Sequence, residues 1–153
     1  IRAYILDLRP RQLNNENLMQ GIQRLVQEFK ANTLIEVNVA GSEDEMNNLP
    51  EDKAIALFHI CQEALANVAK HAKAHRVDIS VWTTSGRVLL EVQDDGRGFD
   101  AEKVKQTIGH GLSNMETRAA NVEGDVDITS EPGNGTSVLA WVPLPEFESL
   151  IIE

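Results

Sequence analysis

One predicted helix carries polar side chains that together suit a metal-bound phosphate chain. Residues 51–73, EDKAIALFHICQEALANVAKHAK, have strong helical periodicity, and four polar residues fall on the side away from the apolar stripe: Glu63, Asn67, Lys70 and His71. At about 100° per residue they lie within an arc of roughly 100° over two turns. Carboxylate and amide oxygens can hold Mg²⁺, and ammonium and imidazole groups donate to phosphate oxygens. The strip therefore suits a metal triphosphate, and it also suits an ordinary solvated helix face.

A second candidate site is VQDDGRGFD, residues 92–100, where a strand pattern ending at Val92 meets two acids and two glycines. Asp94, at the mouth of the strand, can accept a hydrogen bond from an exocyclic amine such as that of adenine. Gly96 and Gly98 allow backbone angles closed to other residues and let a flat ligand approach closely. The run equally suits a tight turn, in which Asp95 is a turn residue. A calcium loop is a poor match, because its acids alternate and a distal glutamate completes it.

Two further glycine-rich stretches shape turns and could also serve a ligand. In GHGLSNMETRA, residues 109–119, Gly109 and Gly111 precede a helix predicted over 112–122. Free N–H groups at a helix start beside a glycine turn form an anion site. A P-loop is excluded here because no Gly-Lys-Ser/Thr follows. In PGNGTSV, residues 132–138, the first four residues predict a hairpin turn, and Thr136 adds a hydroxyl where a strand begins.

The elements that must position these residues follow from the periodicity of the apolar residues. Helices are predicted over 17–32, 51–73 and 112–122, a strand over 34–41, and a polar mobile loop over 101–110. Two hairpins are predicted over 77–96, around a Ser-Gly turn, and over 125–145. Hairpins imply antiparallel pairing, and the intervening helices must cover a face of the sheet. The sequence therefore predicts a two-layer α/β sandwich with a mixed, mostly antiparallel sheet, and a doubly wound parallel sheet fits badly.

Length and charge set outer limits on the function. The chain has 153 residues, the size of one domain, and a net charge of -10, which disfavours binding to nucleic acid or anionic lipid. Cys61 is its one cysteine, so no intrachain disulfide can form. No apolar run approaches the ~20 residues that cross a bilayer, and no signal peptide is visible. Because the sequence starts at Ile1, we interpret it as a piece of a longer protein.

The glycine-rich and polar stretches occur in an order that resembles the nucleotide-binding boxes of the sensor histidine kinase ATP-binding domain. That order is Asn67-x-x-Lys70-His71, Asp94-x-Gly96-x-Gly98, Gly109-x-Gly111-Leu112 and Gly135-Thr136. The segments QEALANVAKHAKAHRVDISV, VQDDGRGFD, GHGLSNMETRA and GNGTSV are close to the subfamily that pairs with response regulators carrying helix-turn-helix output domains. YILDLRP resembles the end of that subfamily's dimerisation helix. The resemblance covers nearly the whole chain and implies the Bergerat-type fold shared with DNA gyrase, MutL and a heat-shock chaperone.

The resemblance implies a role for the polar helix strip in holding phosphates. Asn67 would bind the Mg²⁺ that bridges the phosphates, and Glu63 beside it would position metal or water. Lys70 and His71 would contact phosphate. These roles agree with the physical requirement of phosphoryl transfer, which is mainly positioning and neutralisation of charge.

The resemblance also implies a base-binding end and a lid. Asp94 would take the adenine amino group, with Gly98 against the ring and Thr136 assisting through a water, and Gly96 of the same box would also bind the nucleotide. The phosphate-side turn and its neighbours would be Gly109, His110, Gly111 and Leu112, with 101–110 as the lid. The contribution of His110 is open. The phenylalanine-rich box of other kinase subfamilies is missing.

The implied function is that of an ATP-binding catalytic domain (10–145), preceded by the end of a dimerisation helix (1–9) and followed by a tail (146–153). It would use Mg-ATP to phosphorylate a histidine for relay to a response regulator, within a cytoplasmic homodimeric module without direct membrane contact by this part. The histidines of this chain lack the acid neighbour of an acceptor, which should lie upstream: His59, His71, His75 and His110. The alternatives are an anti-sigma-factor-type serine kinase and a degenerate, non-catalytic interaction domain.

Overall fold

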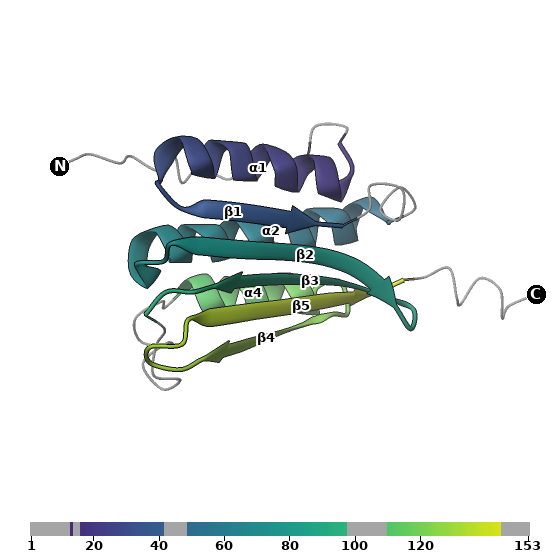
Figure 1. Cartoon of the computed structure of the whole chain (residues 1–153). Coiled ribbons are helices and arrows are strands. Elements are labelled where there is room, and N and C mark those ends of the chain that lie inside the picture. Colours follow the sequence, from purple (N-terminus) through teal and green to yellow (C-terminus); the bar gives the residue numbers. More distant parts are fainter. Residues whose placement is uncertain (1–12, 14–15, 42–48, 98–109, 145–153) are drawn as a thin grey trace, which may run out of the picture.

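The computed structural model describes residues 13, 16–41, 49–97 and 110–144 (Figure 1). Their elements follow the predicted order of helix, strand, helix, hairpin, helix and hairpin. They are α1 (Leu18–Asn32), β1 (Glu36–Ala40), α2 (Glu51–Asn67), the π-helix η2 (Val68–Ala72), β2 (Arg76–Thr84), β3 (Arg87–Asp94), α4 (His110–Ala120), β4 (Asp125–Ser130) and β5 (Thr136–Pro143). The predictions for 1–9, 101–109 and 146–153 lie outside the described residues. None of the described helices is both long and apolar enough to cross a bilayer.

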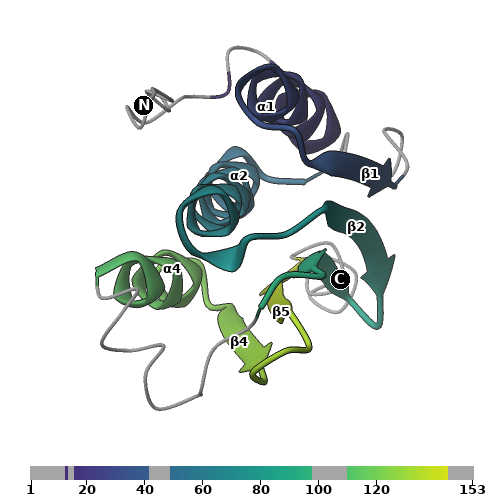
Figure 2. The same ribbon diagram turned by 60° about the vertical axis from the view of Figure 1, so that its left-hand side comes forward.

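The strands form one five-stranded sheet in the order β1-β2-β3-β5-β4. β1 pairs with β2 in parallel, and the other neighbours are antiparallel. The parallel pair follows from α2, which carries the chain back between these two strands. Figure 2 shows α1, α2 and α4 together on one side of the sheet. The predicted two-layer sandwich with a mixed, mostly antiparallel sheet is confirmed.

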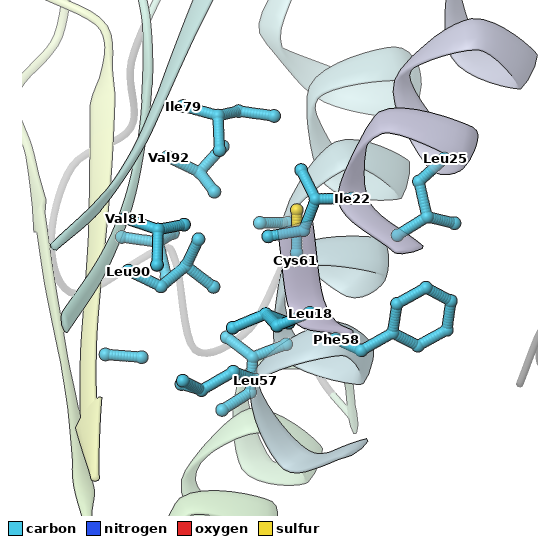
Figure 3. Close-up of a cluster of buried hydrophobic side chains, with 14 of the residues drawn as sticks. Leu18, Ile22, Leu25, Leu57, Phe58, Cys61, Ile79, Val81, Leu90 and Val92 are labelled. Atoms are coloured by element: carbon cyan, nitrogen blue, oxygen red, sulfur yellow. The ribbon is translucent and has the colours of Figure 1, made fainter. Parts of the chain in front are cut away.

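Alternation along the strands sends every second side chain toward the helices. In the row Ile128, Val138, Val92 and Ile79, the strands β4, β5, β3 and β2 each place one apolar residue on the covered face. These side chains pack against the buried stripe of α2, which includes Leu57 and Cys61, and against Leu18 and Ile22 of α1 (Figure 3). The apolar layer between sheet and helices is the core of the domain.

The element boundaries depart from the prediction in ways that have local causes. The two-residue turn Ser85-Gly86 confirms the first hairpin, with φ of 52° and 75°, the left-handed pair that matches strand twist. β1 is shorter than predicted, since Leu34 is 98% exposed and makes no strand pairing. β3 runs on to Asp94 rather than ending at Val92, because Asp94 pairs with both neighbouring strands.

Both predicted helices near the candidate site differ from the prediction. The helix expected over 51–73 is α-helical only to Asn67 and continues as the π-helix η2. Lys73, in the left-handed region with φ of 51°, then ends it. The helix expected over 112–122 begins at His110, so Gly111 lies within its first turn and not before it.

Candidate functional site

A polar row occupies one end of the covered face of the sheet. Asp94 of β3 lies directly opposite Thr136 of β5, and Thr136 lies opposite Ser130 of β4. Strand parity directs all three toward the helices, in line with apolar residues such as Val92 and Val138 in the preceding row. Core positions are normally apolar, so three hydroxyl or carboxyl groups in one row indicate a binding function at this end.

Asp94 is the one charged residue in the described part of the chain that is buried, with 7% of its surface exposed. Its Oδ1 accepts a hydrogen bond of 2.8 Å from the Gly96 N–H, and its carboxylate also accepts from the Thr136 N–H. Loss of water around the carboxylate raises the pKa of Asp94, against the lowering effect of these two donors. No cationic partner of Asp94 is found among the described residues; burying an acid in such surroundings is costly, and such acids occur preferentially at functional sites.

The turn before β5 holds the Thr136 hydroxyl against its neighbours. Thr136 Oγ1 lies 2.8 Å from Ser130 Oγ, and Ser130 Oγ donates to the Gly135 carbonyl at 3.2 Å. Gly135 has φ of +78°, and a Cβ there would collide with the Asp94 carbonyl oxygen. Glycine is therefore required by both the backbone angle and the close approach of β3.

Asp95, adjacent to Asp94, has a structural task. Its Oδ1 accepts from the backbone N–H groups of His75 and Arg76, at 2.8 and 3.0 Å. Slight burial acts to raise its pKa, but the hydrogen bonds outweigh this and the pKa of Asp95 is lowered. Asp95 thus fastens the start of β2 to the end of β3, consistent with the turn role that the sequence favoured.

The end of α2 brings the predicted phosphate strip to the same end of the molecule. In Figure 1 the end of α2 and η2, the end of β3, and the starts of β5 and α4 all lie on the left-hand side. Glu63 and Asn67 are half-buried, and Lys70 is exposed. Among the described residues, none hydrogen-bonds to the side chains of Glu63 or Asn67. No described residue therefore occupies their side-chain oxygens.

The π-helix alters the predicted strip beyond Asn67. A π turn takes about one residue more than an α turn, so Lys70 and His71 no longer follow Asn67 at α-helical angles. The predicted strip is therefore α-helical only as far as Asn67, and the placement of its last two members stays a prediction. The backbone of His71 lies in η2. Short π segments inside helices occur frequently at functional sites.

The remaining predicted residues are placed only in part. The backbone of His110, Gly111 and Leu112 forms the first turn of α4, whose start lies at the end of the sheet that carries the polar row. Gly98 and Gly109 lie outside the described residues. Among the described residues, no group of three or more His, Cys, Asp or Glu could hold a metal ion by itself. Mg²⁺ is commonly bound through one or two protein oxygens and substrate phosphates, and the available oxygen of Asn67 fits that arrangement.

Ser130 is the member of the polar row that motif reasoning missed. A signal was present, since the alternation Val126, Ile128, Ser130 in DVDITS puts Ser130 on the apolar face of its strand. Its partner across the hairpin is Thr136, which was singled out. Register between the two strands was the missing information.

Comparison with known proteins identifies the family. Residues 52–146 match the family described as histidine kinase-, DNA gyrase B-, and HSP90-like ATPase. The chain is 33% identical over 144 residues to the sensor histidine kinase LiaS of Bacillus subtilis, covering 94% of this chain and 39% of LiaS. It is 31% identical to the signal transduction histidine-protein kinase/phosphatase DegS of Brevibacillus brevis, covering 94% of this chain and 37% of DegS. The chain thus spans less than half the length of these relatives.

A solved structure shows the same fold. The histidine kinase domain of the Erythrobacter litoralis EL346 blue-light activated histidine kinase superposes with a TM-score of 0.67 at 22% identity, covering 94% of this chain and 69% of that one. The matched family segment runs from the start of α2 past the end of β5 and therefore contains the whole polar row and the end of α2. The chain belongs to the family of histidine kinase-, DNA gyrase B-, and HSP90-like ATPases.

Proposed function

We propose that this chain is the ATP-binding catalytic domain of a two-component sensor histidine kinase. It binds ATP with Mg²⁺ and presents the γ-phosphate to a histidine on a dimerisation domain outside residues 1–153. That phosphate then passes to an aspartate of a response regulator. Family membership and relatives such as the sensor histidine kinase LiaS support the proposal.

The observation that carries the proposal is the buried acid at the end of the sheet. Among the described residues the Asp94 carboxylate has two backbone donors and no cationic partner, and its exposed fraction of 7% leaves it little water. A ligand that donates an N–H to it would offset the cost of its burial. The exocyclic amine of adenine is such a donor, so Asp94 selects the base while Thr136, across the strand pair, assists through a water.

The phosphates extend from the base toward the end of α2. Asn67 offers an oxygen to Mg²⁺, Glu63 one turn earlier positions metal or water, and Lys70 and His71 contact the phosphates. Bound Mg²⁺ would neutralise phosphate charge, which is the main requirement of phosphoryl transfer. The side chains themselves orient the nucleotide and carry no covalent step.

Glycines on either side of the lid complete the proposed site. Gly98 lies against the adenine ring, and Gly96, whose N–H donates to Asp94, belongs to the same nucleotide-binding turn. The lid spans 101–110, and its far end contains the phosphate-side turn. The residues of that turn and the adjoining helix are Gly109, His110, Gly111 and Leu112.

The partners follow from the proposed reaction. The domain (10–145) works beside its own dimerisation helices, of which 1–9 are the end, in a homodimer, and a response regulator receives the phosphate. A net charge of -10 disfavours nucleic acid as a partner. The proposed location is cytoplasmic, where ATP and response regulators are found.

Isothermal titration of the chain with ATP, with and without Mg²⁺, tests the proposal. Saturable binding that is strengthened by Mg²⁺ is expected for the unaltered chain. Asn67→Asp and Asp94→Asn should each weaken it at least tenfold, whereas the matched exposed controls Asn121→Asp and Asp127→Asn should not. Absence of saturable binding, or equal effects of site and control variants, would refute the proposal.

Catalytic competence needs a separate assay, because the acceptor lies outside this chain. The chain with ATP alone should show little autophosphorylation. Supplied with a dimerisation domain carrying an acceptor histidine, it should form an acid-labile phosphohistidine. Phosphorylation of a serine on a partner protein would instead favour an anti-sigma-factor-type kinase.

A further inference from the structure

Both tryptophans of the chain lie on the face of the sheet that the helices leave open. Trp82 of β2, Leu89 of β3 and Trp141 of β5 each stand between buried neighbours on their strands, so alternation points their side chains away from the core. Trp82 is paired with Leu89, and Leu89 with Trp141. These three residues therefore form one continuous line across three strands, which we call the tryptophan row.

The tryptophan row is an apolar surface with a polar rim. Its members are partly exposed, and no described helix or strand covers this face (Figure 2). The guanidinium of Arg87 lies over the Trp141 ring, with Cζ 4.0 Å from the ring centre. Asp125 of β4 is paired with Trp141 on the other side. A contiguous apolar patch with charged residues at its rim is typical of a docking surface.

The chain leaves the sheet beside this row. The Leu144 N–H donates to the carbonyl of Gly86 in the β2–β3 turn at 2.8 Å, three positions after Trp141. Trp82 and Trp141 are separated by two strand spacings, about 10 Å. The nine residues that follow, 145–153, would span roughly 14 Å even as a helix. They can therefore reach the whole row from their point of attachment.

The sequence of this C-terminal segment (residues 145–153, PEFESLIIE) suits an apolar surface. Three apolar residues recur at i, i+3 and i+4, the spacing of one helix face: Phe147, Leu150 and Ile151. A proline followed by a glutamate is typical of the first turn of a helix. A helix of this length is not stable alone in water, so such an amphipathic segment needs a surface that covers its apolar face.

We propose that the tryptophan row is the docking surface for the chain's own C-terminal segment, whose apolar face covers both tryptophans. A second copy of the chain is a less suitable occupant, because each copy has a net charge of -10, which opposes association. Attachment at Leu144 gives the segment a high effective concentration at the row, which a separate partner lacks. The inference goes beyond the proposed ATP binding, since the polar row lies on the covered face of the sheet.

Tryptophan fluorescence of the whole chain tests this docking, because both reporters lie in the row. The double variant Phe147→Asp, Leu150→Asp should shift the emission to longer wavelength and raise quenching by acrylamide, since water and quencher then reach the rings. Ser149→Asp is the matched control, because it adds a charge about 200° around the helix from Phe147 and should change neither quantity. Trp82→Phe and Trp141→Phe leave one reporter each, and each remaining reporter should respond to the double variant.

The inference would be overturned if the unaltered chain and the double variant had the same emission and quenching, or if Ser149→Asp had the same effect as the double variant. Sedimentation over a range of concentrations identifies the occupant. A monomer with constant quenching is expected, whereas a dimer whose quenching falls as concentration rises would assign the row to a second copy.

Protection of Cys61 from thiol reagents checks that the variants are folded. The double variant should keep this protection, and its loss would mean that the segment belongs to the core, which also contradicts docking on the open face. These readouts need no nucleotide. A chain that does not bind ATP would therefore refute the proposed function and leave this inference standing.

Discussion

The pKa values of two adjacent acids of this chain are shifted in opposite directions, because one carboxylate is buried and the other is exposed and accepts backbone hydrogen bonds. Asp94 points into the covered face, where loss of water raises its pKa. Asp95 points away, and two backbone N–H groups lower its pKa. Burial of the Asp94 carboxylate lowers the stability of the fold, whereas the hydrogen bonds of Asp95 stabilise it.

Asp94→Asn is expected to keep or raise stability while it weakens nucleotide binding. The pKa of Asp94 is raised in the folded state, so folding favours its protonated form. The contribution of Asp94 to the free energy of unfolding is therefore greatest below its ordinary pKa of 3.8 and is lost as pH rises through the folded pKa. Asparagine is uncharged, so at pH 7 it avoids the destabilising burial of a carboxylate, and its side-chain oxygen can still accept from the Gly96 N–H. Urea unfolding at pH 7, followed by tryptophan fluorescence, measures the difference. A variant markedly less stable than the unaltered chain would contradict this account.

Asp95→Ala should destabilise the fold only where Asp95 is ionised. Its lowered folded pKa means that its contribution is present above the ordinary pKa of 3.8 and is lost as pH falls through the folded value. The loss at pH 7 should be about 1 kcal/mol, since the group is exposed and partly screened. Urea unfolding at pH 7 and at pH 3 checks this, and a difference of equal size at both values would count against it.

At the scale of elements, the site depends on how the β4–β5 hairpin meets the end of β3. The turn before β5 contains two glycines with positive φ, Gly133 at +84° and Gly135 at +78°. Only Gly135 is crowded, since a Cβ there would meet the Asp94 carbonyl, while the space around Gly133 is open. Comparing substitutions at the two glycines therefore separates the energetic effect of the left-handed backbone from the effect of steric crowding.

Gly135→Ala should cost much more stability than Gly133→Ala. Gly133→Ala should lower the free energy of unfolding by about 1 kcal/mol, because alanine is strained only by the left-handed backbone conformation. At Gly135 the collision adds to this, and a total of about 3 kcal/mol or more is expected. Urea unfolding of both variants gives the comparison. Similar losses at the two positions would show that β3 can yield to the added methyl group.

The switch from α2 to η2 is the element that the sequence could not predict. An α turn and a π turn differ by one residue, and the short run VAKHA has no residue type that selects between them. The positive φ of Lys73 could not be predicted from the sequence either, since lysine rarely adopts that conformation. Such local features are set by what the helix must contact and are therefore invisible to periodicity.

At the scale of the whole molecule, one layer of apolar side chains joins every element, and Cys61 lies at its centre. Its side chain is 0% exposed, and burial raises the pKa of the thiol to about 12. The thiol of Cys61 should therefore be unreactive in the folded chain, because reagents cannot reach it and because the raised pKa keeps it from forming the reactive thiolate.

Cys61 should therefore report global unfolding. A thiol reagent such as dithiobis-nitrobenzoate is expected to leave the native chain unlabelled over minutes and to modify one thiol per chain in denaturing urea. ATP at saturating concentration should slow labelling near the midpoint, because ligand binding stabilises the folded state. Rapid labelling of the native chain would mean that the core opens locally around α2.

Alternation and turn chemistry were sufficient to predict the sheet and its hairpins, because the period of 2 and the Ser-Gly and Pro-Gly signals are local. The parallel pairing of β1 and β2 is not local, since it depends on how α2 crosses the sheet. Asp94 and Thr136 were found as parts of motifs. Ser130 was not, because its role depends on register across the hairpin.

The strand order has a consequence for the biosynthesis of this protein. β5 is the last described strand to be synthesised, yet it lies between β3 and β4. On a ribosome, the earlier strands emerge with a vacant place between them, and the polar row lacks its middle member until Thr136 and the rest of β5 arrive. A nascent chain should therefore acquire nucleotide affinity abruptly, after residue 143 has left the exit tunnel, and premature termination before that residue leaves two exposed strand edges prone to aggregation.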